Sequence, residues 1–261
     1  MKFYKKNFFI KNNIKILILV RLASKRLKDK AISKINNYSI TEILILRLLK
    51  FIDKKSIIIC TSKNQNNSFL KGLSKKHKIS FFAGPEENIF QRIKLCNEKF
   101  NFKHFVRVTG DNPLTDPPSI IKMSNFHIKS KNDFTYTDSL AKGMRPEVIS
   151  MKALDKAASL ANDQLSSEYL TYFFLRKTFK HKKIKLKKYL NDENNISITV
   201  DYQKDLDTLK KILKDDIFKP RKILILSLKN KKKIKENNKK IPIKTKHYDV
   251  SFKNDDQDIL L

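Results

Sequence analysis

Short apolar runs alternate with longer amphipathic stretches along the first part of the chain. The runs predict buried strands over Ile14–Val20, Ser56–Cys60, Ile79–Phe82 and His104–Val108. Each run is bounded by polar residues and is too short for a helix of ordinary length. The chain therefore begins as a series of buried strands separated by segments of a different period.

The segments between these strands have the spacing of helices. Ser39-Ile40-Thr41-Glu42 is a capping box that opens an apolar helix. A Lys-rich helix ends near Lys76, Glu86–Phe100 gathers its apolar residues on one stripe, and a further helix begins at Pro117-Pro118. Strands and helices that alternate in this way predict an α/β fold with a doubly wound, mostly parallel, Rossmann-like sheet.

The alternation breaks from about residue 134 to residue 180, and we interpret this segment as a small insertion. The pattern predicts two short strands and two helices within it: Phe134–Thr137, Val148–Met151, Met151–Leu160 and Gln164–Thr178. After the insertion, Ser197–Val200 is predicted to return to the sheet and Lys204–Leu213 to form a helix. Residues 221–261 form a basic C-terminal extension, and residues 1–261 are predicted to be one domain.

The formal net charge of +31 invites a nucleic-acid interpretation, but the distribution of the charge does not favour it. Lysine, isoleucine and asparagine are all abundant, and AT-rich codons encode these three residues, so genome composition is a sufficient cause. The lysines are spread along the chain, without the basic stripe and interleaved aromatics of nucleic-acid-binding modules. We expect no specific nucleic-acid partner, only weak affinity for polyanions at low salt.

Three further features bear on the cellular location. Residues 1–20 mix Lys, Asn and aromatic residues and do not resemble a secretory signal. No window approaches the roughly 18–20 apolar residues that a membrane span needs, so no membrane partner is expected. Cys60 and Cys96 each lie in an apolar element, which predicts buried free thiols in a reducing compartment. These features predict a cytoplasmic protein.

A basic loop directly follows the first predicted strand. It carries Arg21, Ser24, Arg26 and Lys30, close to the carboxyl end of that strand. Ligands of open α/β sheets bind in the crevice beyond the carboxyl ends of the strands. Arginine grips phosphate oxygens in a fork and lysine supplies a mobile charge, so the loop suits a polyphosphate. A plain solvated loop is equally compatible with these residues.

Two aspartates follow predicted strands in the same way. Asp111 comes just after His104–Val108, in a turn where Gly110 lets the backbone approach a ligand. Asp201 ends the β-rich run that starts at Ser197. Because Mg²⁺ prefers one or two carboxylates together with water and substrate phosphates, two strand-end aspartates near a cationic loop predict a magnesium site. The alternative is a turn or helix cap for each, with Asp201 capping the helix that follows.

Four motifs in this order resemble a known family. They are Arg21-x-x-Ser24-x-Arg26-Leu27-x-x-Lys30, the segment from Phe82-Ala83-Gly84-Pro85-Glu86 to Arg92, Arg107–Pro117 (RVTGDNPLTDP) and Thr199–Leu206 (TVDYQKDL). Together they resemble the cytidylyltransferases that make CMP-activated sugars, which include the CMP-sialate, CMP-deoxyoctulosonate and spore-coat-polysaccharide types. The tail around residues 235–251 is also similar to the spore-coat type.

The resemblance implies that CMP passes from CTP to a sugar acid of the nonulosonate kind, with release of pyrophosphate, for surface polysaccharide or glycan synthesis. It implies a catalytic group of Arg26, Lys30 and Asp111 and a magnesium ion held by Asp111 and Asp201. The nucleotide-binding set is Arg21, Ser24, Arg26, Lys30, Thr61, Gly84 and Gly110. The sugar-binding set is Arg145, Glu147 and Glu168. Residues 134–180 would lie on the sugar side and contribute to a homodimer.

The chain departs from the family pattern at three places. Lys28-Asp29 stands where the family usually has Pro-Gly, and Glu168-Tyr169 stands where it usually has Glu-His. The segment Lys142–Glu147 keeps Gly143 and Glu147 but lacks the usual acidic residue between them. Two alternatives therefore stay open. One is a degenerate member that binds nucleotide without turnover, and the other is a metal-dependent glycosyltransferase of similar architecture.

Overall fold

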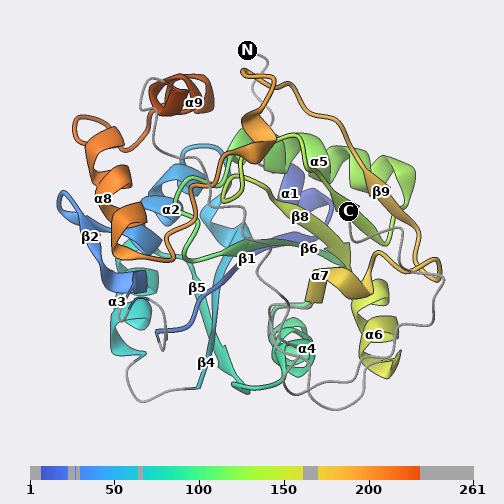
Figure 1. The fold of residues 1–261 in the computed structure, drawn as a ribbon. Helices are drawn as coiled ribbons and strands as arrows, with labels where there is room; N and C mark the ends of the chain where they lie inside the picture. Colours follow the sequence, from blue (N-terminus) through green and yellow to red (C-terminus); the bar gives the residue numbers. More distant parts are fainter. Residues whose placement is uncertain (1–6, 23–26, 28–29, 64–66, 161–169, 230–261) are drawn as a thin grey trace, which may run out of the picture.

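The sequence folds around one seven-stranded sheet in the computed structural model, which describes residues 7–22, 27, 30–63, 67–160 and 170–229 (Figure 1). The strands lie in the order β5-β4-β1-β6-β8-β7-β9. Their bounds are β1 (Ile14–Leu19), β4 (Ile57–Ser62), β5 (Ser80–Gly84), β6 (His104–Thr109), β7 (Phe134–Tyr136), β8 (Glu147–Ser150) and β9 (His181–Lys183). A separate two-stranded sheet joins β2 (Lys34–Ile35) and β3 (Tyr38–Ser39).

The doubly wound, mostly parallel sheet predicted from the sequence is confirmed. β1 pairs in parallel with β4 on one side and with β6 on the other, and β4 pairs in parallel with β5. Within the seven-stranded sheet, only β8, in the predicted insertion, runs antiparallel to its described neighbours, β6 and β7. The chain builds outward from β1 to β5 and then crosses to β6. The carboxyl ends of β1 and β6 are therefore the switch point where α/β sheets bind ligands.

Helices cover both faces of the sheet (Figure 1). One face packs against α1, α2, α3, α5, α8 and α9, and the other packs against α4, α6 and α7. Their bounds are α1 (Phe8–Lys11), α2 (Ile40–Leu49), α3 (Ser68–His77), α4 (Ile89–Phe100), α5 (Pro117–Ser130), α6 (Met151–Leu160), α7 (Leu170–Phe173), α8 (Gln203–Ile212) and α9 (Arg221–Lys229).

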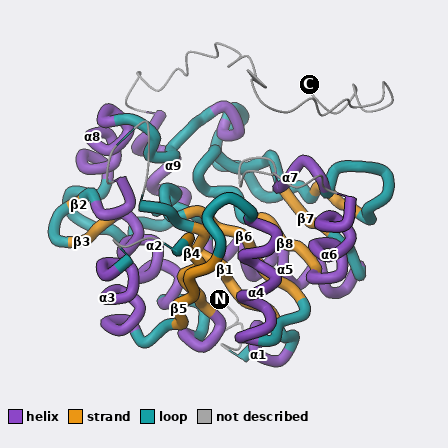
Figure 2. The backbone as a smooth tube through the Cα atoms, turned by 90° about the horizontal axis from the view of Figure 1, so that it is seen from below, coloured by secondary structure: helices purple, strands orange, loops and turns teal. Residues whose placement is uncertain are grey.

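The apolar strands feed two cores because their side chains alternate. In β1, Ile16 and Ile18 face the core with α2, while Leu17 and Leu19 face the core with α4. All four are buried, as expected for a parallel strand covered on both faces. Figure 2 shows the strands side by side across the middle of the molecule, from β5 to β7. None of the described helices is long and apolar enough to span a bilayer.

The prediction that Ser197–Val200 returns to the sheet is wrong. Ser197 makes only an isolated bridge with Lys142, and the segment runs as a loop. The free side of β6 is already taken by β8, so no edge beside β6 remains for this segment to join. The backbone amides of Ile198 and Val200 instead donate to the carbonyls of Lys142 and Asp111, both at 3.0 Å.

The helix predicted over Gln164–Thr178 differs from the structure at its C-terminal end. Residues 161–169 lie outside the described part, and α7 ends at Phe173, after which the chain continues in turns. Phe174 and Phe179 both enter the core with α4, in an edge-on ring contact at 5.5 Å. Residues five apart do not share a face of an α-helix, so this packing requires the chain to turn. The single-domain organisation of residues 1–261 stays a prediction.

Candidate active site

Three charged side chains meet at the carboxyl ends of β1 and β6. The Lys30 ammonium lies 2.7 Å from Oδ2 of Asp111 and 3.2 Å from Oδ1 of Asp201. Lys30 opens a short 3₁₀ turn, η1 (Lys30–Ile32), after the basic loop, while Asp111 follows β6 and Asp201 precedes α8. The structure thus brings three predicted site residues together from segments that are far apart in the sequence.

A glycine sets the spacing between the first two segments. The Gly110 amide donates to the carbonyl of Leu19 at 2.9 Å, which ties the end of β6 to the end of β1. A Cβ atom on Gly110 would lie 2.6 Å from Cβ of Val20, closer than side chains approach. Only glycine therefore lets the turn that carries Asp111 lie against the start of the basic loop.

A second close approach places Asp201. The amide of Val200 donates to the carbonyl of Asp111, which fixes the residue before Asp201 beside the other aspartate. Gly143 has a φ of 88°, and a Cβ there would lie 2.9 Å from the amide nitrogen of Thr199. The turn around Gly143 can therefore lie directly against residues 198–199 and press them toward β6.

The alternative role for Asp201, a helix cap, falls to Asp205 instead. The Asp205 carboxylate accepts hydrogen bonds from the backbone amides of Asp201 at 3.0 Å and Tyr202 at 2.8 Å. This arrangement satisfies amides at the start of α8, as capping requires. The Asp201 carboxylate faces Lys30 and accepts from the Thr199 hydroxyl at 3.3 Å.

The charge of Lys30 controls the ionisation of Asp111. Burial raises the pKa of this carboxyl, but the Lys30 charge and hydrogen bonds from Lys30 and Thr109 outweigh it. The pKa of Asp111 therefore lies below its usual value, and the group is ionised at neutral pH. Its side chain is 27% exposed and that of Asp201 is 24% exposed, so a ligand from solvent can reach both.

The donor set fits a magnesium ion that brings its own remaining ligands. Within the described ranges, no group of three His, Cys, Asp or Glu side chains has the geometry of a metal site. Asp111 and Asp201 form a pair of carboxylates around a single ammonium group. Mg²⁺ takes one or two carboxylates and fills its other positions with water and phosphate oxygens, so a closed protein cage is not needed.

Three more predicted nucleotide-binding residues, Arg21, Thr61 and Gly84, lie along the same edge of the sheet. Arg21 follows β1 and is exposed, while Thr61 and Gly84 lie at the ends of β4 and β5, where Ser62 pairs with Gly84. The Thr61 hydroxyl is buried and lies 3.5 Å from the side-chain oxygen of Asn67. The predicted residues Ser24 and Arg26, and the departure at Lys28-Asp29, lie outside the described residues.

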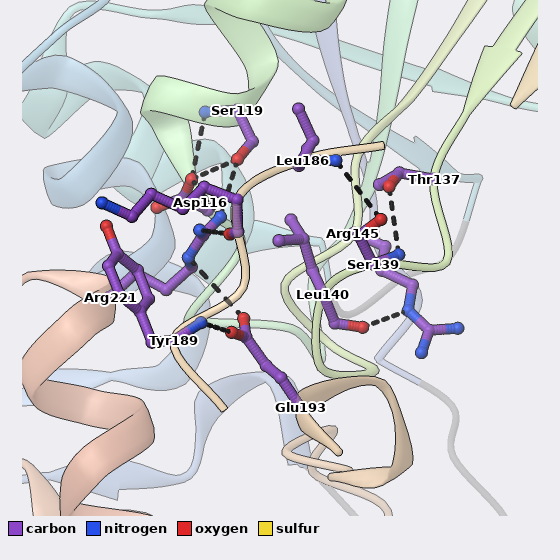
Figure 3. Close-up of polar contacts among 11 residues, drawn as sticks. Asp116, Ser119, Thr137, Ser139, Leu140, Arg145, Leu186, Tyr189, Glu193 and Arg221 are labelled. Carbon is purple, nitrogen blue, oxygen red and sulfur yellow. Dashed lines mark hydrogen bonds and ion pairs between the residues drawn. The ribbon is translucent and has the colours of Figure 1, made fainter. Parts of the chain in front are cut away.

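The predicted sugar-binding residues make contacts within the fold. Glu147 starts β8 directly opposite Arg107 of β6, with 2.8 Å between its Oε2 and Nη1 of Arg107, and it also accepts from the hydroxyl of Thr171 at 3.0 Å. Arg145 donates to the backbone carbonyls of Leu140 at 2.6 Å and Asn194 at 2.7 Å, the first of which is drawn in Figure 3. Glu168 lies outside the described residues.

Sequence reasoning missed a role for Arg92. This side chain is 2% exposed and donates to the carbonyls of Pro85 at 2.7 Å and Glu86 at 2.5 Å. Burial lowers the pKa of its guanidinium, and the nearby charge of Arg21 lowers it further. Arg92 therefore holds the loop after Gly84 in place. The signal that could have revealed this role is its position, because the motif that resembles the family ends at Arg92.

A second missed group joins three distant segments (Figure 3). Arg221 lies 3.4 Å from Oδ2 of Asp116 and 3.7 Å from Oε1 of Glu193, and its guanidinium is stacked 4.8 Å from the ring centre of Tyr189. Asp116 also caps α5 through the amide of Ser119 at 3.0 Å. This group fastens the start of α9 to the start of α5. Its members are too far apart in the sequence for any local pattern to show it.

A mostly parallel sheet with a charged Lys–Asp–Asp cluster at its switch point is the arrangement expected of an α/β protein that binds a nucleotide there. The family model for cytidylyltransferases matches residues 15–247, and the chain belongs to this family. A 30% identical relative is an uncharacterized protein of Methanocaldococcus jannaschii, over 191 residues, or 72% of this chain and 78% of the relative. The spore coat polysaccharide biosynthesis protein SpsF of Bacillus subtilis is 26% identical over 167 residues, 62% of this chain and 70% of SpsF.

Solved structures agree on the fold. A cytidylyltransferase from Leptospira borgpetersenii superposes with a TM-score of 0.78 at 22% identity, over 86% of this chain and 97% of that one. A CMP:2-keto-3-deoxy-manno-octonic acid synthetase in complex with CTP gives 0.59 at 9% identity, over 77% and 98%. A Mycobacterium tuberculosis protein, Rv0371C, in complex with manganese gives 0.56 at 11% identity, over 76% and 98%. At these identities the likeness shows the fold alone.

Proposed function

We propose that this enzyme transfers CMP from CTP to a sugar acid of the nonulosonate kind and releases pyrophosphate, in the synthesis of a surface polysaccharide or glycan. The observation that carries the proposal is the convergence of Asp111 and Asp201 on Lys30 at the carboxyl ends of β1 and β6. Membership of the cytidylyltransferase family supports the nucleotide, and the likeness to SpsF supports the polysaccharide.

In the proposed reaction a hydroxyl of the acceptor attacks the α-phosphorus of CTP, and the bond to the β-phosphate oxygen breaks. Asp111 and Asp201 would hold Mg²⁺, which when bound neutralises phosphate oxygens and polarises the α-phosphate. Lys30 and Arg26 would hold the leaving pyrophosphate by charge-assisted hydrogen bonds. The remaining work of the protein is alignment of the two substrates and stabilisation of charge in the transition state.

We assign the CTP to the strand ends and the acceptor to the insertion side. Arg21, Ser24, Thr61, Gly84 and Gly110 would complete the nucleotide site, with Arg92 as the support of the loop after Gly84. The loop from Leu140 to Glu147 would form the acceptor side. Arg145 and Glu147 hold this loop by contacts within the fold, and together with Glu168 they would present donors and acceptors to a sugar acid.

A second candidate is nucleotide binding without turnover. The observation that favours it is the ion pair of Lys30 with both aspartates, because the same oxygens cannot fully serve an ammonium group and a divalent cation together. In this case the protein would bind CTP tightly but would not cleave it. Formation of pyrophosphate and a CMP-sugar distinguishes the transferase from a protein that only binds the nucleotide.

The test is a screen of nucleotides against sugar acceptors with Mg²⁺, read as pyrophosphate release and as the CMP-sugar formed. We expect release only with CTP and an acidic acceptor, and none from Asp111→Asn. CTP binding by calorimetry, without pyrophosphate release from any acceptor, would favour the second candidate. Tighter binding of UTP or GTP than of CTP would contradict the cytidylyl assignment. Release with a neutral amino sugar alone would contradict the sugar acid.

We also propose that the protein works in the cytoplasm as a homodimer, without a specific nucleic-acid partner. Cys60 and Cys96 are buried free thiols, as a reducing compartment favours. Two large apolar side chains of the insertion are exposed, Leu160 at 47% and Tyr172 at 46%, and they would be covered by a second copy of the chain.

A further inference from the structure

A cavity of about 490 Å³ lies apart from every residue assigned above to the nucleotide, metal or sugar. It opens where the C-terminal end of α2, the first turn of α5 and the segments 186–189 and 218–222 meet. Seven of its sixteen lining residues are Lys or Arg, against 57 of 261 in the whole chain, and one is acidic. The excess of positive charge is therefore greater here than the basic composition alone provides.

Arg47 lies in the wall of the cavity, and no carboxylate of the described residues forms an ion pair with it. This side chain is 5% exposed, and its Nη1 donates to the carbonyls of Ile217 at 2.9 Å and Lys219 at 3.1 Å. Among the residues that the structure describes, no carboxylate lies within 4 Å of Arg47, and its Nε atom has no hydrogen-bond partner. Burial lowers the pKa of the guanidinium, and the more distant Asp116 and Asp216 only partly offset that effect.

The single carboxylate of the lining cannot supply the missing charge. Asp116 is occupied by the Ser119 amide and by Arg221, as Figure 3 shows. A buried charge without a counter-ion is costly, and an anion in the cavity would offset that cost. The exposed Lys50, Lys122 and Lys222 at the rim would add to the attraction.

Aromatic rings make up another part of the wall. The Lys50 ammonium lies 5.0 Å from the ring centre of Phe218, and the Lys187 ammonium lies 5.8 Å from that of Tyr189. Phe51 and three prolines, Pro117, Pro118 and Pro220, complete the apolar surface. A volume of this size is within the range of small-molecule sites, which combine apolar walls with a few convergent polar groups.

We propose that this cavity binds a small organic anion, in which a phosphate or carboxylate group is carried on a flat apolar body. The anionic group lies toward Arg47 and the rim lysines, and the apolar body lies against Phe218 and Tyr189. The proposal rests on residues that take no part in the proposed transfer reaction, so the two can fail separately.

The test uses phenyl phosphate as the probe, titrated by calorimetry into the full chain at physiological ionic strength. We compare a cavity pair, Lys50→Glu with Lys122→Glu, and a control pair, Lys99→Glu with Lys75→Glu. The control is matched because Lys99 is also exposed and lies 5.5 Å from the ring centre of Phe100. All four lysines are exposed, and thermal melting of each double variant checks that the fold is retained.

We expect saturable binding of one phenyl phosphate per chain, at least tenfold weaker in the cavity pair and unchanged in the control pair. Benzyl alcohol, which lacks the charge, should not bind. Lys30→Met should bind the probe as the unaltered protein does. No saturable binding, an equal loss in the two pairs, or a loss in Lys30→Met would each overturn the proposal. The last two results would indicate a diffuse basic surface and binding at the Lys30 cluster respectively.

Discussion

At the scale of single residues, the charge balance of the candidate active site depends on Lys30. Its side chain is 12% exposed, and its ammonium group is shared by two carboxylates. Lys30 therefore stabilises the free site and, in the proposed reaction, must also bind phosphate. These two roles lead to different expectations for the metal and for the nucleotide.

The two aspartates should be needed for turnover and not for folding. Asp111→Asn and Asp201→Asn should each abolish or nearly abolish pyrophosphate release, because each removes a carboxylate that would hold the metal. The matched control is Asp205→Asn, which keeps an acceptor oxygen for the amides at the start of α8 and should keep both fold and turnover. Near-native release by Asp201→Asn, with a normal melting curve, would remove Asp201 from the site.

Removal of Lys30 should affect the metal and the nucleotide in opposite directions. In Lys30→Met the two aspartates lose their counter-ion, so the nucleotide-free protein should bind Mn²⁺ several-fold more tightly, as measured by electron paramagnetic resonance. CTP should bind more weakly by about 1.5–3 kcal/mol, as expected for a lost charge-assisted hydrogen bond. Lys34→Met, at an exposed lysine in β2, is the control and should change neither. Weaker Mn²⁺ binding in Lys30→Met would show that the lysine does not compete with the metal.

At the scale of elements, we expect the interface between two copies of the chain to lie on the insertion. α6 and α7 cover one face of the sheet and leave Leu160 and Tyr172 exposed at their surfaces. Exposed apolar side chains that lie in one segment are typical of association surfaces.

Charge placed on this surface should separate the subunits. Leu160→Glu with Tyr172→Glu should shift the protein from dimer to monomer in sedimentation velocity, because two buried carboxylates at an interface lack partners. Ile223→Glu is the matched control, since Ile223 on α9 is 48% exposed and lies outside the insertion. A monomeric unaltered protein, or equal dissociation in the control, would contradict the proposed dimer.

At the scale of the whole molecule, a buried histidine pair links stability to pH. His127 of α5 is fully buried, and its two ring nitrogens lie 3.0 Å from the Thr135 hydroxyl and 3.2 Å from Nδ1 of His104. Burial, with a smaller effect of His104, lowers the pKa of His127 to about 3. The unfolded chain therefore binds more protons than the folded one between pH 6.5 and about 3.

Because the unfolded chain binds more protons in this range, the free energy of unfolding should fall as the pH falls below 6.5. Between pH 6.5 and pH 5 the loss from His127 amounts to about 1.6 kcal/mol, measured by urea denaturation. His127→Gln should be less stable at neutral pH and should show a smaller decline. His181→Gln, at a half-buried surface position, should keep the full decline. An unchanged decline in His127→Gln would mean that other groups cause it.

The sequence by itself determined the regular part of the molecule. The apolar runs gave the strands β1, β4, β5 and β6, because a buried parallel strand needs only a short local run of apolar residues. The ends of β6 and β1 then located Asp111 and the loop that carries Lys30 near one edge, since parallel strands share a direction. The capping box at Ser39 was equally visible, because it acts on neighbouring backbone. Gly110 and Gly143 were visible as turn residues, but their close approaches to Val20 and Thr199 were not.

The tertiary structure alone decided how segments far apart in the sequence meet. Asp201 lies in a loop and not at a strand end, because β8 already occupies the edge beside β6. Glu147 faces Arg107 because the register of β6 and β8 places them opposite each other. The basic cavity forms where four segments converge, and only their packing sets its charge. Such contacts depend on sheet register and side-chain packing across long sequence separations, which no local pattern encodes.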